Sequence, residues 1–463
     1  MTEHEDKSGG SDDDIFELLA SLFGGDSEEL KRSLSQSGTD LEGLEALGGQ
    51  LPPGFTQMFS QFATGSIFPT SSESDTSVNW ELAHNLARQS AVADGDPSVG
   101  PRAERESQDA LHAAELWLDA STALPASGAT THVWSRSEWV EATLPQWRNL
   151  TESIADSMAE AMSEVMRESG AQMPEGAMPF GVDPSQMLRH FGGTVFGMQV
   201  GSAVGTLAGE VLGAGDIGVC LTSDPVAALL PVNISALAES FDEPEAELRL
   251  FIALREAALS RLYTHASWLR SRLDTIIERY AQEIRIDMEQ LEETVRSIDP
   301  ANPEELQDAL SGGVFEVSKT PEQQRLLTQL ETLLALIDGW VDVVVAHAAG
   351  KNLPRSAALR EIMTRRRAVG GPAEQTFMGL VGLELRPRRL REASELWQVI
   401  TDEWGADKRD ELWSHPDFLP EDTDLDDAQN FLTRHAKSAS EHQDLDQVLS
   451  EILNEHDEDS GNE

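Results

Sequence analysis

A ladder of glycines is the feature of this sequence that most restricts its fold. A glycine recurs at every fourth position in one segment, as Gly193, Gly197, Gly201, Gly205, Gly209 and Gly213. Because an α-helix completes a turn about every 3.6 residues, this spacing draws a stripe of glycines along one helical face. A stripe without side chains lets a second backbone approach closely. The segment is therefore predicted to be a closely packed helix.

The same segment is apolar enough to suggest a membrane helix as an alternative. Gln199 and Glu210 interrupt it, however, and no basic cluster flanks it on either side. We therefore expect a buried helix in a soluble core and no membrane span. A phosphate-binding loop is less favoured still, because such loops follow a strand and do not form a regular ladder within a helix.

Helical spacing of apolar residues dominates the chain from Val78 onward. In one place Ser135 precedes Glu138 by three residues, the pattern of a helix N-terminal capping box. One segment, 216–231, is short, apolar and ends in proline, and we expect it to form a small β-hairpin or an extended connection. The fold class is therefore predicted to be mainly α, a multi-helix domain with at most a small β element.

Composition divides the chain into three regions. Residues 1–75 mix acidic runs with Ser, Gly and Pro and are expected to be a mostly disordered N-terminal region. Residues 76–440 are expected to form a single helical domain. Residues 441–463 are again acidic and are expected to be a disordered tail.

Charge and cysteine content limit the partners and the compartment. The chain has 82 acidic and 34 basic residues and a formal net charge of -48, which disfavours nucleic acid and anionic membranes as partners. The lone Cys220 cannot form an internal disulfide, and the polar N-terminus does not resemble a signal peptide. We expect a cytoplasmic protein, with a peptide or another protein as its partner.

Several sequence blocks, taken in order, resemble the zincin-like metallopeptidase type 2 family, whose members are described as hydrolases. The resemblance spans roughly residues 78–435, and its specificity comes from the number and order of the blocks. They are Val78-Asn79-Trp80, the segment 134–147, the glycine ladder, the segment 254–269, Gly370-Gly371-Pro372-Ala373-Glu374-Gln375 and the segment 382–390. The resemblance implies a mainly helical zincin-like domain and, in active relatives, a zinc ion.

A zincin site uses His-Glu-x-x-His, in which two imidazoles one helical turn apart bind zinc and the glutamate acts as general base. The matching residues here are Arg255-Glu256-Ala257-Ala258-Leu259. Arg255 brings a fixed positive charge to the first ligand position, and Leu259 brings no lone pair to the second. Glu256 is then a relic of the general base, and no metal cofactor is expected.

The resemblance also implies a third ligand from a later helix, and Asp338 stands in the position of that acidic residue. We hypothesise that Arg255 supplies the positive charge that zinc supplied, by pairing with Asp338 or Glu256 in a partly buried cluster. From the residues alone there is a simpler alternative. Arg255 and Glu256 could lie on the solvated face of an amphipathic helix, with Leu259 on its buried face.

Other residues offer weaker sites. His265 and His347 lack one-turn spacing to Leu259 and Asp338, so a new metal site that uses either of them is the less favoured alternative, and we expect His265 to have a packing or hydrogen-bonding role. The sequence shows neither a nucleophile elbow nor a Walker loop, and Cys220 lies in an apolar stretch. The run Arg365-Arg366-Arg367, followed at a distance by Arg386, Arg388, Arg389 and Arg391, is expected to clamp acidic segments of its own fold, with binding of an anionic ligand or partner as the alternative.

Two classes of function follow. The first is a catalytically inactive zincin-like scaffold that binds a peptide or protein in the former cleft. The second is an active hydrolase or metalloprotease that uses ligands not recognised in the sequence. The missing histidine pair favours the first.

Overall fold

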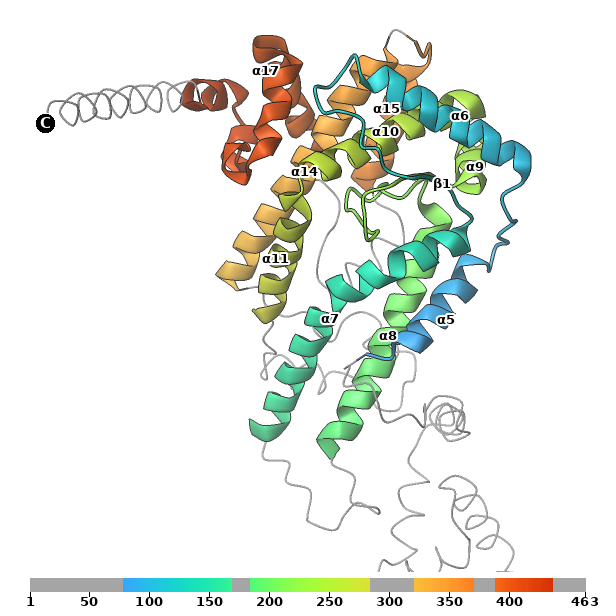
Figure 1. Ribbon diagram of the computed structural model, residues 1–463. Helices are drawn as coiled ribbons and strands as arrows, with labels where there is room; N and C mark the ends of the chain where they lie inside the picture. Colours follow the sequence, from blue (N-terminus) through green and yellow to red (C-terminus); the bar gives the residue numbers. More distant parts are fainter. Residues whose placement is uncertain (1–77, 169–183, 284–319, 351, 370–387, 436–463) are drawn as a thin grey trace, which may run out of the picture. The chain divides into compact units, whose positions relative to one another are not determined.

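The computed structural model describes residues 78–168, 184–283, 320–350, 352–369 and 388–435 (Figure 1). The predicted disordered regions, 1–75 and 441–463, and the blocks 370–375 and 382–387 lie outside these residues. The described elements are mainly α-helical, as predicted. The helices are α5 (Trp80–Ala91), α6 (Pro101–Leu118), α7 (Arg136–Glu168), α8 (Pro184–Glu210), α9 (Pro231–Phe241), α10 (Glu245–His265), α11 (Trp268–Gln282), α14 (Pro321–Ala349), α15 (Ser356–Val369) and α17 (Leu390–Glu411).

The glycine ladder lies in α8 as far as Gly209, whereas its last member, Gly213, lies in the loop after the helix, and α8 runs beside α5 (Figure 1). A Cβ atom added to Gly197 would lie 2.7 Å from the carbonyl oxygen of Asn79. One added to Gly201 would lie 2.4 Å from that of Ala83. Real Cβ atoms essentially never come this close to backbone, so the glycines are what allow the two helices to approach. The predicted close packing is confirmed.

Helix α10 lies at the centre of the core. Its residues from Leu248 to Tyr263 are buried except Leu250, including four with ionisable side chains: Arg249, Arg255, Glu256 and Arg261. Burying a charge is costly unless it is paired, so each needs partners. Arg261, for example, donates hydrogen bonds to the Glu115 carboxylate, to the Leu124 carbonyl and to Asp119. These contacts fasten α10 to α6.

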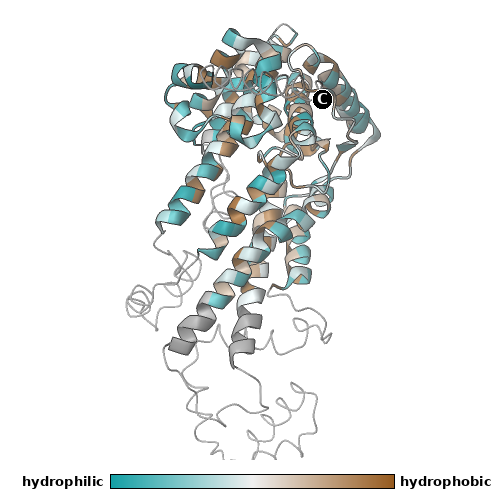
Figure 2. Cartoon of the chain, turned by 60° about the vertical axis from the view of Figure 1, so that its left-hand side comes forward, coloured by the Kyte–Doolittle hydropathy of each residue, from teal (hydrophilic) through white to brown (hydrophobic). Residues whose placement is uncertain are grey.

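Helix α14 is a long apolar helix. Within the described ranges it alone is long and apolar enough to cross a membrane, but 89% of its apolar window is buried within the fold. Such burial is typical of the core helix of a globular domain. Helix α8 does not meet the same criterion. Figure 2 shows hydrophilic and hydrophobic residues mixed along the helices, as expected when one face meets a core and another meets solvent.

The sheet of the described residues is very small. Strand β1 (Thr131–Val133) pairs in parallel with β2 (Ala227–Leu229), with Thr131 opposite Ala227. An isolated antiparallel bridge joins Gly213 to Leu229. The expectation of a small β element is confirmed. The hairpin considered for residues 216–231 is wrong, because the strand in that segment pairs with a segment nearly a hundred residues earlier rather than with its own neighbour.

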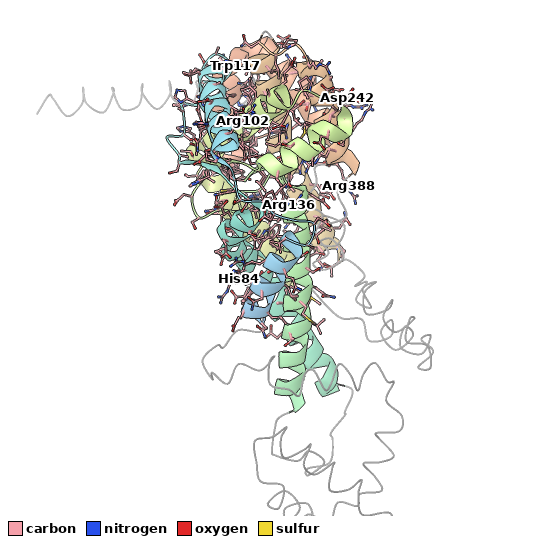
Figure 3. All side chains as sticks on the ribbon, turned by 90° about the vertical axis from the view of Figure 1, so that its right-hand side faces the viewer. His84, Arg102, Trp117, Arg136, Asp242 and Arg388 are labelled. Atoms are coloured by element: carbon pink, nitrogen blue, oxygen red, sulfur yellow. The ribbon has the colours of Figure 1, made fainter. Side chains whose placement is uncertain are left out.

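The N-terminus of α7 is fixed by polar contacts. The Ser135 amide donates to Glu138 Oε2 at 2.7 Å and the Glu138 amide donates to Ser135 Oγ at 3.2 Å, so the predicted capping box is confirmed. Arg136, labelled in Figure 3, donates from its backbone to Asp96 and from Nε to Asn233 Oδ1. Asn233 in turn donates to the carbonyl oxygens of Ala208 and Val211. These bonds join the starts of α7 and α9 to the end of α8.

The C-terminal elements close the core through a buried aspartate. Asp410 accepts hydrogen bonds from the Trp340 indole at 2.7 Å and from the Thr122 hydroxyl at 2.6 Å. It also accepts from the Ala123 amide and is paired with Arg409. Three short 3-10 helices, η1 (Leu412–Ser414), η2 (Pro416–Phe418) and η3 (Asp422–Leu425), follow α17.

Candidate functional site

Helix α10 carries the three residues of the altered motif into the core. Arg255, Glu256 and Leu259 are 7%, 2% and 4% exposed, respectively. The alternative that Arg255 and Glu256 lie on a solvated helix face is therefore wrong. The apolar residues of α10 are distributed almost evenly around the helix axis. Its sequence therefore does not distinguish an outer face from an inner one.

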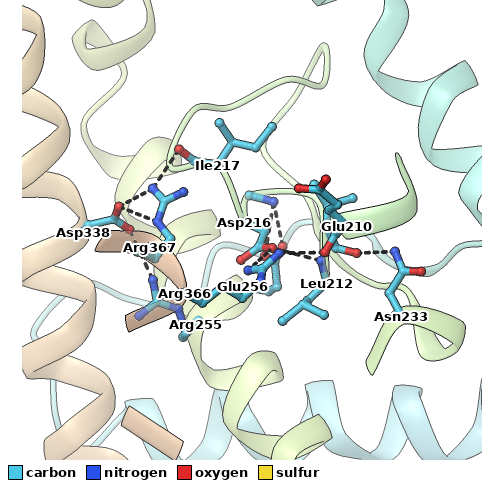
Figure 4. Close-up of polar contacts among 12 residues, drawn as sticks. Glu210, Leu212, Asp216, Ile217, Asn233, Arg255, Glu256, Asp338, Arg366 and Arg367 are labelled. Atoms are coloured by element: carbon cyan, nitrogen blue, oxygen red, sulfur yellow. Dashed lines mark hydrogen bonds and ion pairs between the residues drawn. The ribbon is translucent and has the colours of Figure 1, made fainter. Parts of the chain in front are cut away.

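Asp338, on α14, faces Arg255 across the interface between the two helices (Figure 4). Nη2 of Arg255 donates to Oδ1 of Asp338 at 3.2 Å. The second carboxylate oxygen, Oδ2, accepts from Nε of Arg367 at 3.2 Å and also from its Nη2. Asp338 is 1% exposed. The hypothesised pair of Arg255 with Asp338 is present, and Arg367 is a second cation that the hypothesis did not include.

Glu256 points away from this ion pair, into the loop that follows α8. Its carboxylate accepts the Gly215 amide, with Oε2 at 2.9 Å and Oε1 at 3.2 Å. Burial raises the pKa of Glu256 to about 8, the Gly215 hydrogen bond opposes this rise, and the charge of Asp216 adds to it. A Cβ on Gly213 would lie 2.3 Å from the Glu256 carboxyl carbon, so the loop covers this side chain directly.

A second ion pair lies beside Glu256. Asp216 accepts the Leu212 amide at 3.0 Å and Nη1 of Arg366 at 2.8 Å (Figure 4). Burial acts to raise the pKa of Asp216, but the charges of Arg366 and Arg367 and the hydrogen bonds to the carboxylate outweigh it and lower the pKa overall. Nη2 of Arg366 also donates to the Glu210 carbonyl at 2.6 Å.

The loop from Val211 to Leu221 is thus held over the motif from two sides. From α15, Arg367 donates to the Ile217 carbonyl at 2.9 Å. From α10, the Tyr263 hydroxyl donates to the Gly218 carbonyl at 2.8 Å. Gly218 has φ +85°, a conformation that favours glycine. Charged groups and backbone groups of this cluster satisfy one another, and only Arg366 among the arginines and carboxylates named here is substantially exposed, at 26%.

A comparison with known protein families assigns the chain that carries this buried cluster to a family. The sequence profile of the zincin-like metallopeptidases matches residues 78–432, which include α10, α14 and α15. The chain belongs to this family. No curated protein matches the chain significantly.

One solved structure supports the zincin-like protein's fold. It is a crystal structure from Chloroflexus aurantiacus, provisionally described as a hydrolase with a novel fold. The two chains share 18% identity with a TM-score of 0.54, over 77% of this chain and 98% of the other. At this identity the likeness concerns the fold alone.

Zinc, which the family name implies, does not fit the residues at the motif of this zincin-like protein. The Arg255 guanidinium carries no lone pair for a metal, and neither does the Leu259 side chain. Within the described ranges, no group of three or more His, Cys, Asp or Glu side chains is arranged to hold a metal ion. Nε2 of His265 instead lies 3.0 Å from the Pro125 carbonyl oxygen. Burial and the charge of Arg409 lower the pKa of His347, near the end of α14.

Sequence reasoning missed several members of the cluster. Arg367 and Asp216 were not assigned to the site, nor was the loop amide of Gly215. The arginine run at 365–367 gave a partial indication of these contacts, because it was predicted to clamp acidic segments of its own fold. That prediction is confirmed for Arg366, which pairs with Asp216, and for Arg367, which pairs with Asp338, whereas Arg365 pairs with the exposed Glu361 of its own helix.

Proposed function

We propose that this zincin-like protein is a catalytically inactive member of its family, in which a buried cluster of ion pairs has replaced the metal site. In this proposal the protein acts in the cytoplasm as a binding scaffold for a peptide or protein. Glu256 is a relic of the general base, and Arg255, Leu259 and Asp338 occupy altered ligand positions.

The observation that carries the proposal is the pairing of Asp338 with two guanidinium groups. A buried carboxylate without a cation would be strongly destabilising, whereas charge-assisted hydrogen bonds to Arg255 and Arg367 satisfy it. The arginines therefore provide, inside the protein, the positive charge that a metal would otherwise provide. They also join three helices, because Arg255 lies on α10, Asp338 on α14 and Arg367 on α15.

The state of Glu256 supports the same conclusion. A general base must accept a proton from a bound water and must be reachable by that water. With a pKa raised to about 8, the Glu256 carboxyl is mainly protonated at pH 7. It is also 2% exposed and covered by the loop at Gly213 and Gly215. In this conformation it cannot act on a substrate.

The burial of the motif also changes where a partner would bind. The sequence suggested the former cleft, but Arg255, Glu256, Leu259 and Asp338 are all less than 9% exposed and cannot contact a peptide. A partner would instead contact the outer surface. The net charge of -48 favours a basic peptide or protein there.

The zinc content of the native protein tests the inactive assignment. The tag-free protein is purified without chelators, equilibrated with zinc, desalted and measured by elemental mass spectrometry, alongside hydrolysis of a mixed peptide library. We expect far less than one zinc per chain and no cleavage above a heat-denatured sample. One zinc per chain, or cleavage that a chelator abolishes, would contradict the proposal.

The competing function is a hydrolase that uses other ligands or no metal. One observation favours it, because a buried carboxyl with a strongly shifted pKa is typical of catalytic acids. The same peptide assay separates the two functions. Cleavage that persists with a chelator and disappears in Glu256→Gln would support the hydrolase.

A further inference from the structure

The two carboxylate oxygens of Asp338 accept hydrogen bonds from side chains on different helices. Oδ1 accepts only Arg255 among the hydrogen bonds described, and Oδ2 accepts only Arg367. The two cations approach from α10 and α15, which are separate elements. Removing one of them therefore leaves the other in contact with the carboxylate.

Arg367 is also fixed independently of Arg255. Its side chain is 4% exposed, and Nη2 donates to the Ile217 carbonyl at 2.9 Å as well as to Asp338. A Cβ on Gly218 would lie 3.1 Å from this same Nη2, so the glycine leaves the space that the guanidinium fills. The neighbouring Arg366 contacts Asp216 and the Glu210 carbonyl, and no described bond joins it to Asp338.

We infer that Arg367 is a second, independent barrier to metal binding, which closes the third-ligand position even when both histidine positions are restored. The inference rests on the proposed function, because it takes Asp338 as the former third ligand. Its physical basis is that a divalent ion bound to Asp338 must approach the immobile charge of Arg367 at close range. Two like charges this near in a buried site repel strongly.

Four variants of the full-length chain test the inference. The first, Arg255→His/Leu259→His, restores the imidazole pair. The second adds Arg367→Met, which removes the positive charge that contacts Asp338 and keeps an apolar stem of similar length. The third adds Arg366→Met to the histidine pair instead. This control removes the same charge from the next residue of the same helix but leaves Arg367 in place. The fourth adds Arg367→Gln, which keeps a hydrogen-bond donor near the Ile217 carbonyl.

Zinc affinity is measured by competition with a chromophoric chelator, and the fold of each variant is checked by circular dichroism and gel filtration. We expect the Arg367→Met triple variant to bind one zinc per chain, with a Kd at least about tenfold lower than that of the histidine-pair variant. The Arg366→Met control is expected to stay within a few-fold of the histidine pair. If the Arg367→Met variant does not fold, Arg367→Gln is measured in its place with the same expectation.

The outcomes separate this inference from the proposed function. Equal zinc affinity in the histidine-pair and Arg367 variants would overturn the inference and leave the proposed function intact. An equal gain from Arg366→Met would also overturn it, because net charge and not the contact with Asp338 would then control binding. A folded Arg367 variant that binds no zinc would overturn the inference by showing that Asp338 is not a zinc ligand. Zinc in the native chain would overturn the proposed function itself.

Discussion

Gly205 of α8 lies against Ala87 of α5, so close that a Cβ on the glycine would stand 2.4 Å from the alanine carbonyl oxygen. No rearrangement of a flexible side chain can relieve this contact, because the atom opposite belongs to the backbone. The two helices can pack this way only if the ladder positions that face α5 carry no side chain.

We therefore predict that Gly205→Ala destabilises the protein, by about 1–3 kcal/mol, through overpacking. Gly209 provides a matched control in the same ladder, since nothing lies within 4 Å of a Cβ built there. Gly209→Ala should be neutral or slightly stabilising, because alanine favours a helix over glycine. Chemical denaturation of both variants measures the difference. Equal effects of the two substitutions would mean that the contact with α5 does not limit what Gly205 can be replaced by.

Arg255→Ala is predicted to lower the free energy of unfolding by about 1–3 kcal/mol, because Oδ1 of the buried Asp338 carboxylate loses its partner while Arg367 keeps the carboxylate paired. Zinc content should not change. The exposed pair of Arg365 with Glu361 supplies the control, and Arg365→Ala should cost at most about 0.5 kcal/mol. Thermal and urea unfolding of the two variants provide the comparison. A neutral effect of Arg255→Ala would count against the pairing with Asp338.

The pH dependence of stability should carry the signature of Glu256. Its pKa is raised from 4.5 in the unfolded chain to about 8 in the folded protein, so the folded state holds a proton that the unfolded state releases between these values. The stabilisation from this group is fully present below about pH 4.5 and is lost as the pH rises towards 8, with a slope of at most ~1.4 kcal/mol per pH unit. Glu256→Gln removes the slope.

Urea denaturation at pH 5.5 and pH 8.5 tests this prediction. Relative to the native chain, the Glu256→Gln variant should be more stable at the higher pH than at the lower one. Glutamine keeps an oxygen that can accept the Gly215 amide, so the comparison isolates the titration. A difference between the two proteins that does not depend on pH would show that Glu256 does not titrate in this window.

Gly218→Ala is predicted to cost more than Gly128→Ala. Both glycines have positive φ, +85° and +65°, so each substitution introduces backbone strain of about 1–2 kcal/mol. Only at Gly218 does the new Cβ also meet Arg367, whereas nothing lies within 4 Å at Gly128. The excess in unfolding free energy reports the contact with the guanidinium. Equal costs for the two variants would mean that Arg367 moves aside freely.

Much of the fold follows from local patterns in the sequence. The ladder in α8 needs only the helical period and the absence of a side chain, and the cap at Ser135 needs only a neighbour three residues away. The strand at 227–229 could not be paired in advance, because each strand has only three residues and its partner is far away in the chain. A short apolar run does not specify which other run it pairs with.

The site was predictable in part for the same reason. Arg255 and Glu256 were recognised through the spacing of a known motif, and Asp338 through a resemblance. Their burial could not be foreseen, because isolated Arg-Glu neighbours on helices are usually solvated. What reverses that expectation is Arg367, together with the loop amide at Gly215. These contacts join residues that are distant in the sequence, and no local period records them.

The buried carboxylate of Asp410 has a consequence for the order of folding. The groups that it satisfies, the Thr122 hydroxyl, the Ala123 amide and the Trp340 indole, are all synthesised before it. Until Asp410 is synthesised these donors can hydrogen-bond only to water or to other groups. Contacts of such long sequence separation form late, because a long loop must close first. The core of this protein is therefore completed only when α17 has been synthesised. A nascent chain that stalls before Arg409 lacks the Asp410 contacts that join Thr122, Ala123 and Trp340.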